Sequence, residues 1–215
     1  MSLDLLANAY HEQLINNDKA MEHFTSKGVT RELVEEFRLG AVLEPQKEEH
    51  EPYRELPTFP YWNVKDGCTM IRTGGFMLDR VGKWRAGVME HLFPIGDYDV
   101  QLYNVGHSLP GLRTNKVILA NDIHTVLLLR GEGYRAVGVP GYQNWQRPWV
   151  ELFTNSDVTM IVTPLEDEPV NAQKILDLFH KRNISSRMRL LDSSRTLAER
   201  MLDDEVNVQE LLAIG

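Results

Sequence analysis

Cysteine and long hydrophobic runs are scarce in this sequence, and each shortage excludes a class of protein. Its 215 residues include one cysteine, Cys68, which excludes an intramolecular disulfide and any zinc site built from several cysteines. No apolar run approaches the roughly 20 residues that a membrane-spanning helix needs, and residues 1–20 lack the pattern of a signal peptide. We therefore expect a protein of the reducing cytoplasm with no membrane partner.

Basic residues are also in the minority. Lysine and arginine number 23 against 31 aspartates and glutamates, so the net charge is −8 at pH 7. This charge argues against a protein whose whole surface contacts nucleic acid, although it does not exclude a local basic stripe. The seven histidines are scattered without metal-ligand spacing, and no Ser-His-Asp or Cys-His arrangement is identifiable.

Residues 116–141 form the stretch around which the rest of the chain is organised. Residues 117–120 are a short apolar run typical of a buried parallel strand, residues 125–129 an apolar helix, and residues 135–139 a second strand. Together they predict a βαβ unit. This unit places the turn at residues 121–122 at the carboxyl end of the first strand, where open α/β sheets build their sites.

The chain after this unit continues to alternate strands with helices. Two further apolar strands are expected at residues 158–163 and 187–191. Helices are expected at residues 148–153, 171–182, 196–202 and 206–214. Alternation at these lengths predicts a four-stranded parallel sheet covered by helices on both faces, so residues 106–215 are expected to form one α/β domain.

Residues 1–105 are expected to form a separate lobe of the α+β type. Helical spacing predicts a first helix over residues 3–14, a second that starts after Asn17 and a third that starts after Thr30. Residues 41–66 contain four prolines and no clear period, so we expect a long loop or arm there. Residues 68–93 are expected to form short antiparallel strands joined by glycine-containing turns.

Carboxylates follow two of the predicted parallel strands and are candidate metal ligands. Asp122 follows the first strand, and Glu166, Asp167 and Glu168 follow the third; oxygen ligands of this kind suit Mg²⁺. Each also has a structural interpretation, because an aspartate at a strand–helix junction is a good helix cap and acidic residues stabilise a helix N-terminus. Magnesium chemistry on phosphates needs carboxylates that converge from several strand ends, so the structural interpretation is favoured.

The densest basic patch lies between residues 72 and 85 and contains a tryptophan. Arg72, Arg80, Lys83 and Arg85 could contact phosphates, and Trp84 could stack on a base. The alternative is an ordinary solvated surface with Trp84 in the core.

Several short segments are informative as an ordered set. They are Tyr-His-Glu-Gln-Leu at residues 10–14, Phe-Thr-Ser-Lys-Gly-Val-Thr at 24–30, Phe-Arg-Leu-Gly at 37–40, Leu-Tyr-Asn-Val at 102–105, Lys-Val-Ile-Leu-Ala at 116–120, Ala-Val-Gly-Val-Pro-Gly at 136–141 and Asn-Trp at 144–145. The set resembles the polymerase core of bacterial-type DnaG primases, especially the compact phage versions, whose second half is a TOPRIM domain. The resemblance implies a primase-core-like lobe over residues 1–105, a TOPRIM-like domain over residues 106–215, and a template-guiding role for residues 70–90.

The chain departs from that family where catalysis needs acids. The family has a glutamate just after its first TOPRIM strand and an aspartate shortly beyond it, and these fall on Asn121 and Thr125. Its Asp-x-Asp after the third strand falls on Pro164 and Glu166, or one residue earlier if the register shifts. Neutral side chains cannot replace carboxylates as ligands of hard cations, so the resemblance implies a degenerate site with no metal cofactor. The family's zinc-binding domain and helicase-binding region are also not expected in this chain.

These observations predict a catalytically degenerate, primase-related protein of DNA replication, of phage origin, that binds single-stranded DNA or acts as an accessory or regulatory component. Its expected partners are single-stranded DNA and replication proteins such as a primase subunit or a helicase. Two alternatives remain open, and with them the question of enzymatic activity. One is an active, divergent primase that uses Mg²⁺ or Mn²⁺ held by Asp122 and residues 166–168. The other is a protein-interaction module that does not bind nucleic acid.

Overall fold

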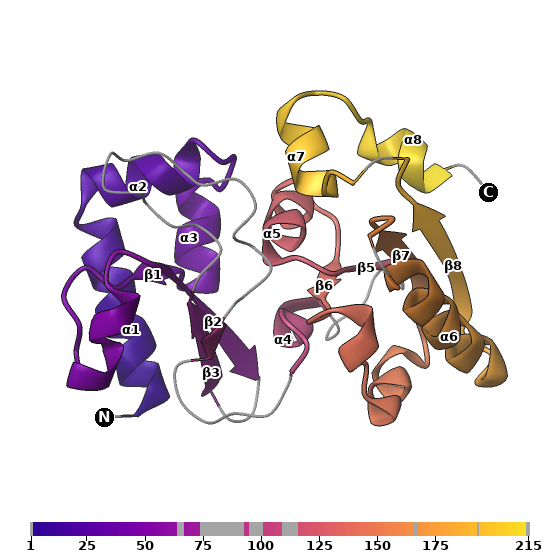
Figure 1. Cartoon of the computed structure of the whole chain (residues 1–215), viewed down its shortest axis with the longest axis horizontal. Helices are drawn as coiled ribbons and strands as arrows, with labels where there is room; N and C mark the ends of the chain where they lie inside the picture. Colours follow the sequence, from indigo (N-terminus) through magenta and orange to yellow (C-terminus); the bar gives the residue numbers. More distant parts are fainter. Residues whose placement is uncertain are drawn as a thin grey trace. The chain divides into compact units, whose positions relative to one another are not determined.

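The computed structural model describes residues 2–63, 67–73, 93–94, 101–108, 116–165, 167–192 and 194–213. The chain divides into two compact units, Met1–Asp99 and Val100–Gly215, and Figure 1 shows that each has its own sheet and helices. The predicted domain boundary, with a primase-core-like lobe over residues 1–105 and a TOPRIM-like domain over residues 106–215, stays a prediction. In the described part of the chain, no helix combines the length and the apolar character needed to cross a membrane.

The first unit begins with the three helices that the sequence predicts. They are α1 (Leu3–Ile15), α2 (Asp18–Thr25) and α3 (Arg31–Phe37). Asn17 caps α2 and Thr30 caps α3, because each side-chain oxygen accepts a hydrogen bond from a backbone N–H in the first helical turn. The predicted caps are therefore confirmed.

An antiparallel sheet follows the helices, and it includes residues for which the sequence predicts a loop. Its strands, in spatial order, are β1 (Gly40–Ala41), β2 (Pro57–Asn63), β3 (Gly67–Thr73) and β4 (Phe93–Pro94). The loop predicted over residues 41–66 is wrong, since this region contains β2 and a 3₁₀ helix, η1 (Glu48–Tyr53). The antiparallel strands predicted after residue 68 are confirmed for β3, while residues 74–92 lie outside the described part of the chain.

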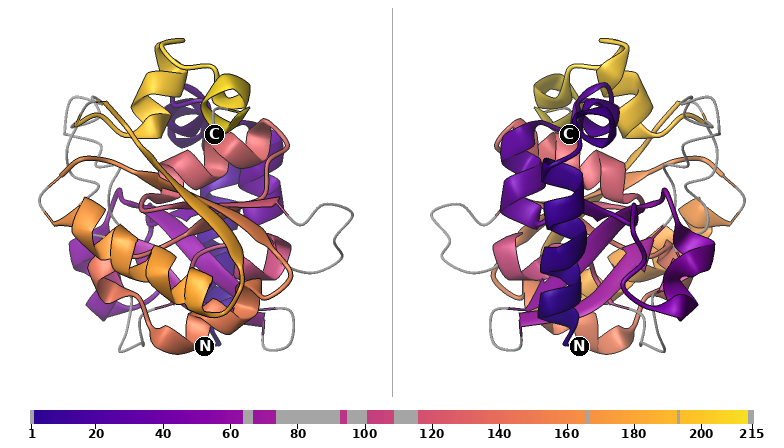
Figure 2. Two further views of the ribbon diagram at one scale, coloured as in Figure 1. Left: turned by 90° about the vertical axis from the view of Figure 1, so that its right-hand side faces the viewer. Right: turned by 90° about the vertical axis from the view of Figure 1, so that its left-hand side faces the viewer.

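Helix α1 packs on this sheet and completes a small core. Leu6, Ala7 and Tyr10 of α1 are buried with Val42 and Ile71, and the right-hand view of Figure 2 shows α1 lying in front of the strands. Glycine is required where β1 meets the helix, because a Cβ on residue 40 would lie 2.6 Å from the carbonyl carbon of Tyr10.

The second unit is the α/β domain that the sequence predicts. Its strands are β5 (Lys116–Ala120), β6 (Ala136–Gly138), β7 (Asp157–Val162) and β8 (Ser185–Leu190), in the order β6-β5-β7-β8 with parallel pairing throughout. Its helices are α4 (Val105–Ser108), α5 (Ile123–Gly131), α6 (Glu168–Lys181), α7 (Leu197–Leu202) and α8 (Val208–Ala213), with 3₁₀ helices η3 (Tyr142–Asn144) and η4 (Arg147–Phe153). The predicted four-stranded parallel sheet is confirmed.

Burial on both faces explains why residues 117–120 of β5 are all apolar. Val117 and Leu119 belong to the core that also contains residues of α6 and η4, whereas Ile118 and Ala120 are buried on the opposite face. Figure 1 shows α5 and α7 on one side of this sheet and α6 on the other. A central parallel strand covered in this way has no solvent face that would favour polar residues.

Candidate functional site at the carboxyl rim

The order of the strands identifies where a site would form. The chain goes from β5 to β6 on one side of β5 and then to β7 on the other side. The crevice beyond the carboxyl ends of β5 and β7 is therefore the topological switch point, where open α/β sheets bind their ligands. We call the described residues that follow the four strands the carboxyl rim; they are residues 121–125, 139–142, 163–165, 167–168 and 191–192.

Asp122 uses its carboxylate to cap a helix. It is the N-cap of α5, and its Oδ1 accepts a hydrogen bond of 2.7 Å from the backbone N–H of Thr125. Burial raises the pKa of Asp122 above its ordinary value, and hydrogen bonding from Thr125 opposes part of this rise. The structural interpretation of Asp122 is thus the one that the geometry supports.

Thr125 is fully buried and also serves a helix N-terminus. Its Oγ1 accepts a hydrogen bond of 3.0 Å from the backbone N–H of Ala198 in the first turn of α7. The first turn of a helix leaves its N–H groups without partners inside the helix. Thr125 therefore satisfies one of these groups and ties α7 to α5.

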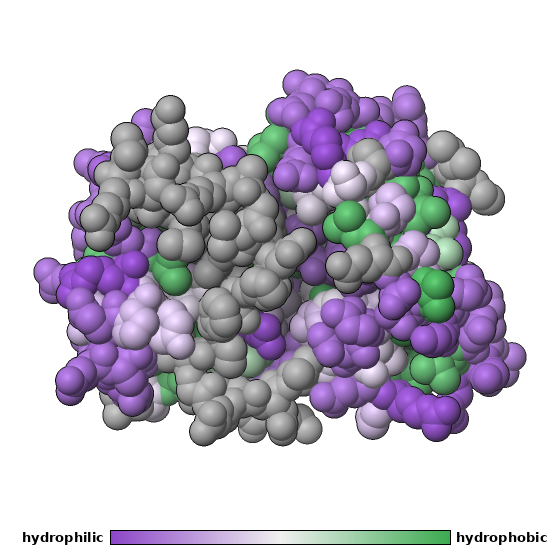
Figure 3. Space-filling view, in the orientation of Figure 1, coloured by the Kyte–Doolittle hydropathy of each residue, from purple (hydrophilic) through white to green (hydrophobic). Residues whose placement is uncertain are grey.

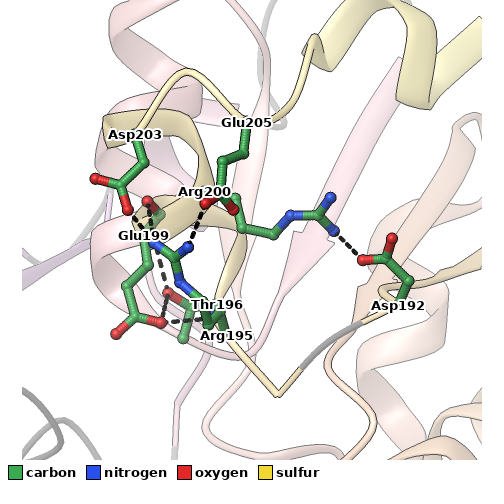
Figure 4. Close-up of polar contacts among 7 residues, drawn as sticks. All are labelled: Asp192, Arg195, Thr196, Glu199, Arg200, Asp203 and Glu205. Carbon is green, nitrogen blue, oxygen red and sulfur yellow. Dashed lines mark hydrogen bonds and ion pairs between the residues drawn. The ribbon is translucent and has the colours of Figure 1, made fainter.

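Polar contacts within its own segment also secure α7. Thr196 and Glu199 form a reciprocal capping box at its N-terminus, and Figure 4 shows the charged groups around it. Arg195 forms ion pairs with Asp203 and Glu205, and Arg200 pairs with Asp192 at 2.6 Å. In each of these pairs at least one partner is exposed to solvent, and such pairs contribute little, so the buried bond to Thr125 is the more important anchor.

Tyr142 occupies the switch point itself. The pairing of β5 with β7 ends at Leu119 and Met160, and the tyrosine hydroxyl lies just beyond. It donates a hydrogen bond of 2.7 Å to the carbonyl of Ile161 and lies 3.3 Å from the carbonyl oxygen of Leu119. Burial raises the pKa of Tyr142 well above its ordinary value, with Glu168 and Asp122 adding to the rise, so the hydroxyl keeps its proton and remains a donor.

The described residues at the end of β7 do not supply a converging set of acids. Pro164 and Leu165 are exposed, Asp167 is exposed without a side-chain capping bond, and Glu168 begins α6. Glu166 lies outside the described residues. Among the residues that the structure describes, no group of three or more His, Cys, Asp or Glu side chains gathers as a metal site would require. The described donors of the rim therefore do not form the converging set of oxygen ligands that a divalent cation prefers.

Solved structures resemble this chain over nearly its whole length, whereas no family model and no curated protein matches it. A DnaG primase catalytic domain bound to single-stranded DNA superposes with a TM-score of 0.70 at 15% identity, over 96% of this chain and 77% of that chain. The Aquifex aeolicus primase, with its zinc-binding and RNA polymerase domains, gives 0.73 at 15% identity, over 98% and 59%. The RNA polymerase domain of Mycobacterium tuberculosis DnaG in complex with double-stranded DNA gives 0.68 at 13% identity, over 97% and 79%.

The chain has the fold of the DnaG primase catalytic core. The resemblance seen in the sequence is confirmed at the level of the fold, and the second unit has the TOPRIM architecture. Within this TOPRIM unit, Asn121 is half-buried directly after β5 and Thr125 is buried in α5. The roles suggested for Asn121, Thr125, Pro164 and Glu166 in a degenerate site stay predictions.

One member of the predicted basic stripe lies in the described part of the primase-type fold. Arg72 is half-buried on β3, and its guanidinium carbon lies 5.7 Å from the ring centroid of Tyr61 on β2. A cation over an aromatic face is favourably placed, and burial raises the pKa of Tyr61 to about 12, so this ring stays neutral. Arg80, Lys83, Trp84 and Arg85 lie outside the described residues, so the stripe as a whole stays a prediction.

Sequence reasoning missed Tyr142, which is the most informative side chain of the rim. The available signal was the Pro-Gly pair before it, because Gly141 has a φ of 75° and turns the chain back toward the strand ends. That turn could be anticipated from the sequence, but the position of the tyrosine ring beyond it could not.

Proposed function

We propose that this chain is a primase-core-like component of DNA replication that binds single-stranded DNA or acts as an accessory protein, and that its TOPRIM site does not synthesise primers. The proposal is supported by one observation: polar side chains of the carboxyl rim are engaged in hydrogen bonds that hold the fold together. Asp122 caps α5, Thr125 accepts a hydrogen bond from the first turn of α7, and the hydroxyl of Tyr142 donates to the carbonyl of Ile161 in β7. A phage origin and a cytoplasmic location remain predictions that accompany this proposal.

Phosphoryl transfer by divalent ions depends on carboxylates that fix the ions against the phosphates. Preorganised electrostatic groups of this kind are each worth about 10²–10³ in rate. A rim in which Asn121 and Thr125 stand at the positions of two of the family's acids lacks the contribution of those two carboxylates. The expected consequence is primer synthesis too slow to detect.

The decisive experiment combines a primer-synthesis assay with Asp122→Asn. Incubation with a single-stranded template, ribonucleotides and Mg²⁺ or Mn²⁺ should give no primer, and calorimetric titration with Mn²⁺ should show no tight stoichiometric binding. Asparagine caps a helix about as well as aspartate, so Asp122→Asn should leave the melting temperature nearly unchanged. Primer synthesis by the natural chain that this variant abolishes would establish the active, divergent primase instead.

Binding of single-stranded DNA is supported by the fold and by charge. A solved DnaG catalytic domain with this fold is bound to single-stranded DNA, and Arg72 places one cation on the sheet of the first unit. We assign the contact to the stripe Arg72, Arg80, Lys83, Trp84 and Arg85. Cations would meet phosphates and the tryptophan would stack on a base.

The salt dependence of binding tests this assignment. Each phosphate contact to a single strand contributes about −0.7 to the slope of log affinity against log salt. Replacing Arg80, Lys83 and Arg85 with alanine should therefore make the slope shallower by roughly 2, as measured by fluorescence anisotropy of a labelled oligothymidine.

A matched control removes three cations from the exposed surface of the second unit, at Lys174, Lys181 and Arg182. This control should keep the slope of the natural chain. An equal change of slope in both variants would mean that only total charge matters. No binding at low salt would favour the protein-interaction module over the proposed function.

A further inference from the structure

The segment that contains α8 is acidic. Residues 203–213 include four aspartates and glutamates and no lysine or arginine, and Figure 3 shows polar surface over α7 and the turn that follows it, at the top of the view. Arg195 forms ion pairs with Asp203 and Glu205 of this segment, as Figure 4 shows. We call residues 203–213 the acidic segment.

Two arginines of the edge strand β8 hold the last turn of α8. Nη2 of Arg187 donates a hydrogen bond of 3.3 Å to the carbonyl of Leu212, and Nε of Arg189 donates one of 3.2 Å to the carbonyl of Leu211. We call Arg187 and Arg189 the arginine pair. The pair belongs neither to the carboxyl rim nor to the basic stripe of the first unit.

The topology places both arginines on one face of the second sheet. They are two residues apart in a strand, so their side chains share a face and leave the strand about 6.6 Å apart. In the parallel register, Thr159 lies opposite Arg187 and Ile161 opposite Arg189. Thr159 in turn lies opposite Ile118, on the face of the sheet away from α6. The two guanidinium groups can therefore reach one small ligand on that face.

Both guanidinium groups keep donors that no hydrogen bond satisfies. Nε of Arg187 and Nη2 of Arg189 are buried, and neither atom has a hydrogen-bond partner in the part of the chain that the structure describes. Buried polar atoms are nearly always hydrogen-bonded in proteins, so an exception requires an explanation such as a bound ion. These two donors therefore require an acceptor that the described part of the fold does not supply.

Helix α8 is a weakly held cover for the arginine pair. Val208 is the one residue of this six-residue helix that is buried, and Leu211 and Leu212 are half-buried. A helix of this length is not stable by itself in water, so α8 depends on these contacts and on its bonds to the arginines. A guanidinium group binds an ionised acceptor about twice as strongly as a neutral carbonyl. An anion would therefore satisfy the arginine pair better than α8 does.

The charges nearby explain why the acidic segment and an anion would exclude each other. Oδ2 of Asp157 lies 3.9 Å from Nη1 of Arg187 and is the one carboxylate among the described residues that pairs with the arginine pair. The adjacent Arg200 is paired with Asp192. The sheet face beneath α8 thus keeps the charge of one arginine, whereas the acidic segment adds carboxylates that repel an anion as long as α8 is docked.

Phosphate is the anion that fits two guanidinium groups best. Arginine binds phosphate through pairs of parallel hydrogen bonds. The oxygens of a phosphate group are arranged around a tetrahedron, so they accept hydrogen bonds from two arginines at once, whereas a carboxylate has two oxygens in one plane.

We propose that the arginine pair binds a phosphate group and that the acidic segment covers the pair until the phosphate displaces it. Nε of Arg187 and Nη2 of Arg189 donate to the phosphate oxygens, and α8 loses its two carbonyl contacts. This inference does not rest on the binding of single-stranded DNA by the basic stripe, because it concerns residues of the second unit alone.

The test uses inorganic pyrophosphate as the probe, titrated at low ionic strength and followed by NMR. Pyrophosphate should bind, and hydrogen exchange of the α8 amides should become faster because the helix is displaced. Arg187→Gln combined with Arg189→Gln should weaken binding roughly tenfold or more. The matched control, Lys174→Gln with Lys181→Gln, removes two exposed cations of α6 and should bind like the natural chain.

Val208→Ser distinguishes a ligand site from arginines that only hold α8. This variant loosens α8 and keeps both arginines, so a larger fraction of molecules has the pair uncovered. The affinity for pyrophosphate should rise by the same factor as that fraction, which hydrogen exchange of α8 measures independently. Arginines with a purely structural role would give no such rise.

Competition identifies the source of the phosphate. Displacement of pyrophosphate by ATP and not by oligothymidine would assign the site to free nucleotides, and displacement by oligothymidine would assign it to the DNA backbone. Absence of pyrophosphate binding, an equal loss of affinity in the α6 control, unchanged or weaker binding by Val208→Ser, or slower exchange of α8 on adding pyrophosphate would each refute the proposal.

Discussion

Thr125→Val offers the sharpest test of how the carboxyl rim is held together. Valine has nearly the shape of threonine but has no hydroxyl, so the N–H of Ala198 loses the acceptor that lies 3.0 Å away in the natural chain. Thr125 and Ala198 are both fully buried, and water cannot easily replace the lost bond. Leaving a buried donor unsatisfied costs about 1–3 kcal/mol.

Hydrogen exchange of the Ala198 amide measures the loss of this hydrogen bond directly. If α7 opens locally, a loss of 1–3 kcal/mol lowers the protection of the Ala198 amide by roughly five- to 150-fold. Thr125→Ser is the matched control, because it keeps the hydroxyl and removes only a methyl group. It should destabilise the second unit by about 0.8 kcal/mol while Ala198 stays protected. Unchanged protection of Ala198 in Thr125→Val would refute the anchoring role of Thr125.

Three further predictions concern other buried groups. Tyr142→Phe should lower the stability of the second unit by about 1–3 kcal/mol in urea unfolding, because the carbonyl of Ile161 loses its donor; a smaller loss would mean that the crevice admits water. The first unit should lose stability as the pH falls below about 6.5, since burial lowers the pKa of His50 and the unfolded chain binds the proton more readily. His50→Gln should weaken that pH dependence, and an unchanged profile would exclude His50 as its source. Burial raises the pKa of Cys68 to about 12, so this thiol should react with a disulfide reagent at pH 8 only on unfolding.

The prediction for His50 depends on the arrangement of its hydrogen bonds. The hydroxyl of Tyr10 accepts the N–H of Gln46 at 3.3 Å and lies 2.5 Å from Nδ1 of His50. The hydroxyl therefore donates its own hydrogen bond to Nδ1, which acts as the acceptor, and the ring proton of the neutral histidine lies on Nε2. Protonation of Nδ1 would remove this acceptor. The exposed Glu49 carboxylate, 3.7 Å from Nε2, and Lys47 are the charged groups beside it.

The strands that could be predicted best from the sequence are those buried on both faces of the sheet. β5 and β7 are buried on both faces, so their residues form apolar runs that need no knowledge of the rest of the fold. β2 was missed because Pro57 and Pro60 argue against a strand. Pro57 is its first residue, and Pro60 lies beyond the two residues that pair with β1, which are positions where proline is tolerated. An irregular register at Tyr61 and Trp62 also breaks the alternation of the strand.

At the carboxyl rim, predictability depends on how far apart in the sequence the contacting residues lie. The capping role of Asp122 could be predicted because donor and acceptor are three residues apart in the sequence. The bond from Ala198 to Thr125 joins residues 73 positions apart, and the hydroxyl of Tyr142 meets a carbonyl 19 positions away. No local pattern encodes such contacts, so only the folded chain reveals that these side chains serve structure.

The polar groups at this rim also explain why a loss of metal ligands need not weaken the fold. Carboxylates that converge at a strand edge repel one another unless a cation neutralises them. Thr125 and Tyr142 are neutral, and their hydroxyl groups are matched to a backbone N–H and a backbone carbonyl. An edge built in this way is stable through its own hydrogen bonds and packing. A residue such as Thr125 in place of an acid would therefore remove a metal ligand without leaving an uncompensated charge at the edge, which is the physical basis for proposing that this TOPRIM unit has become a binding scaffold.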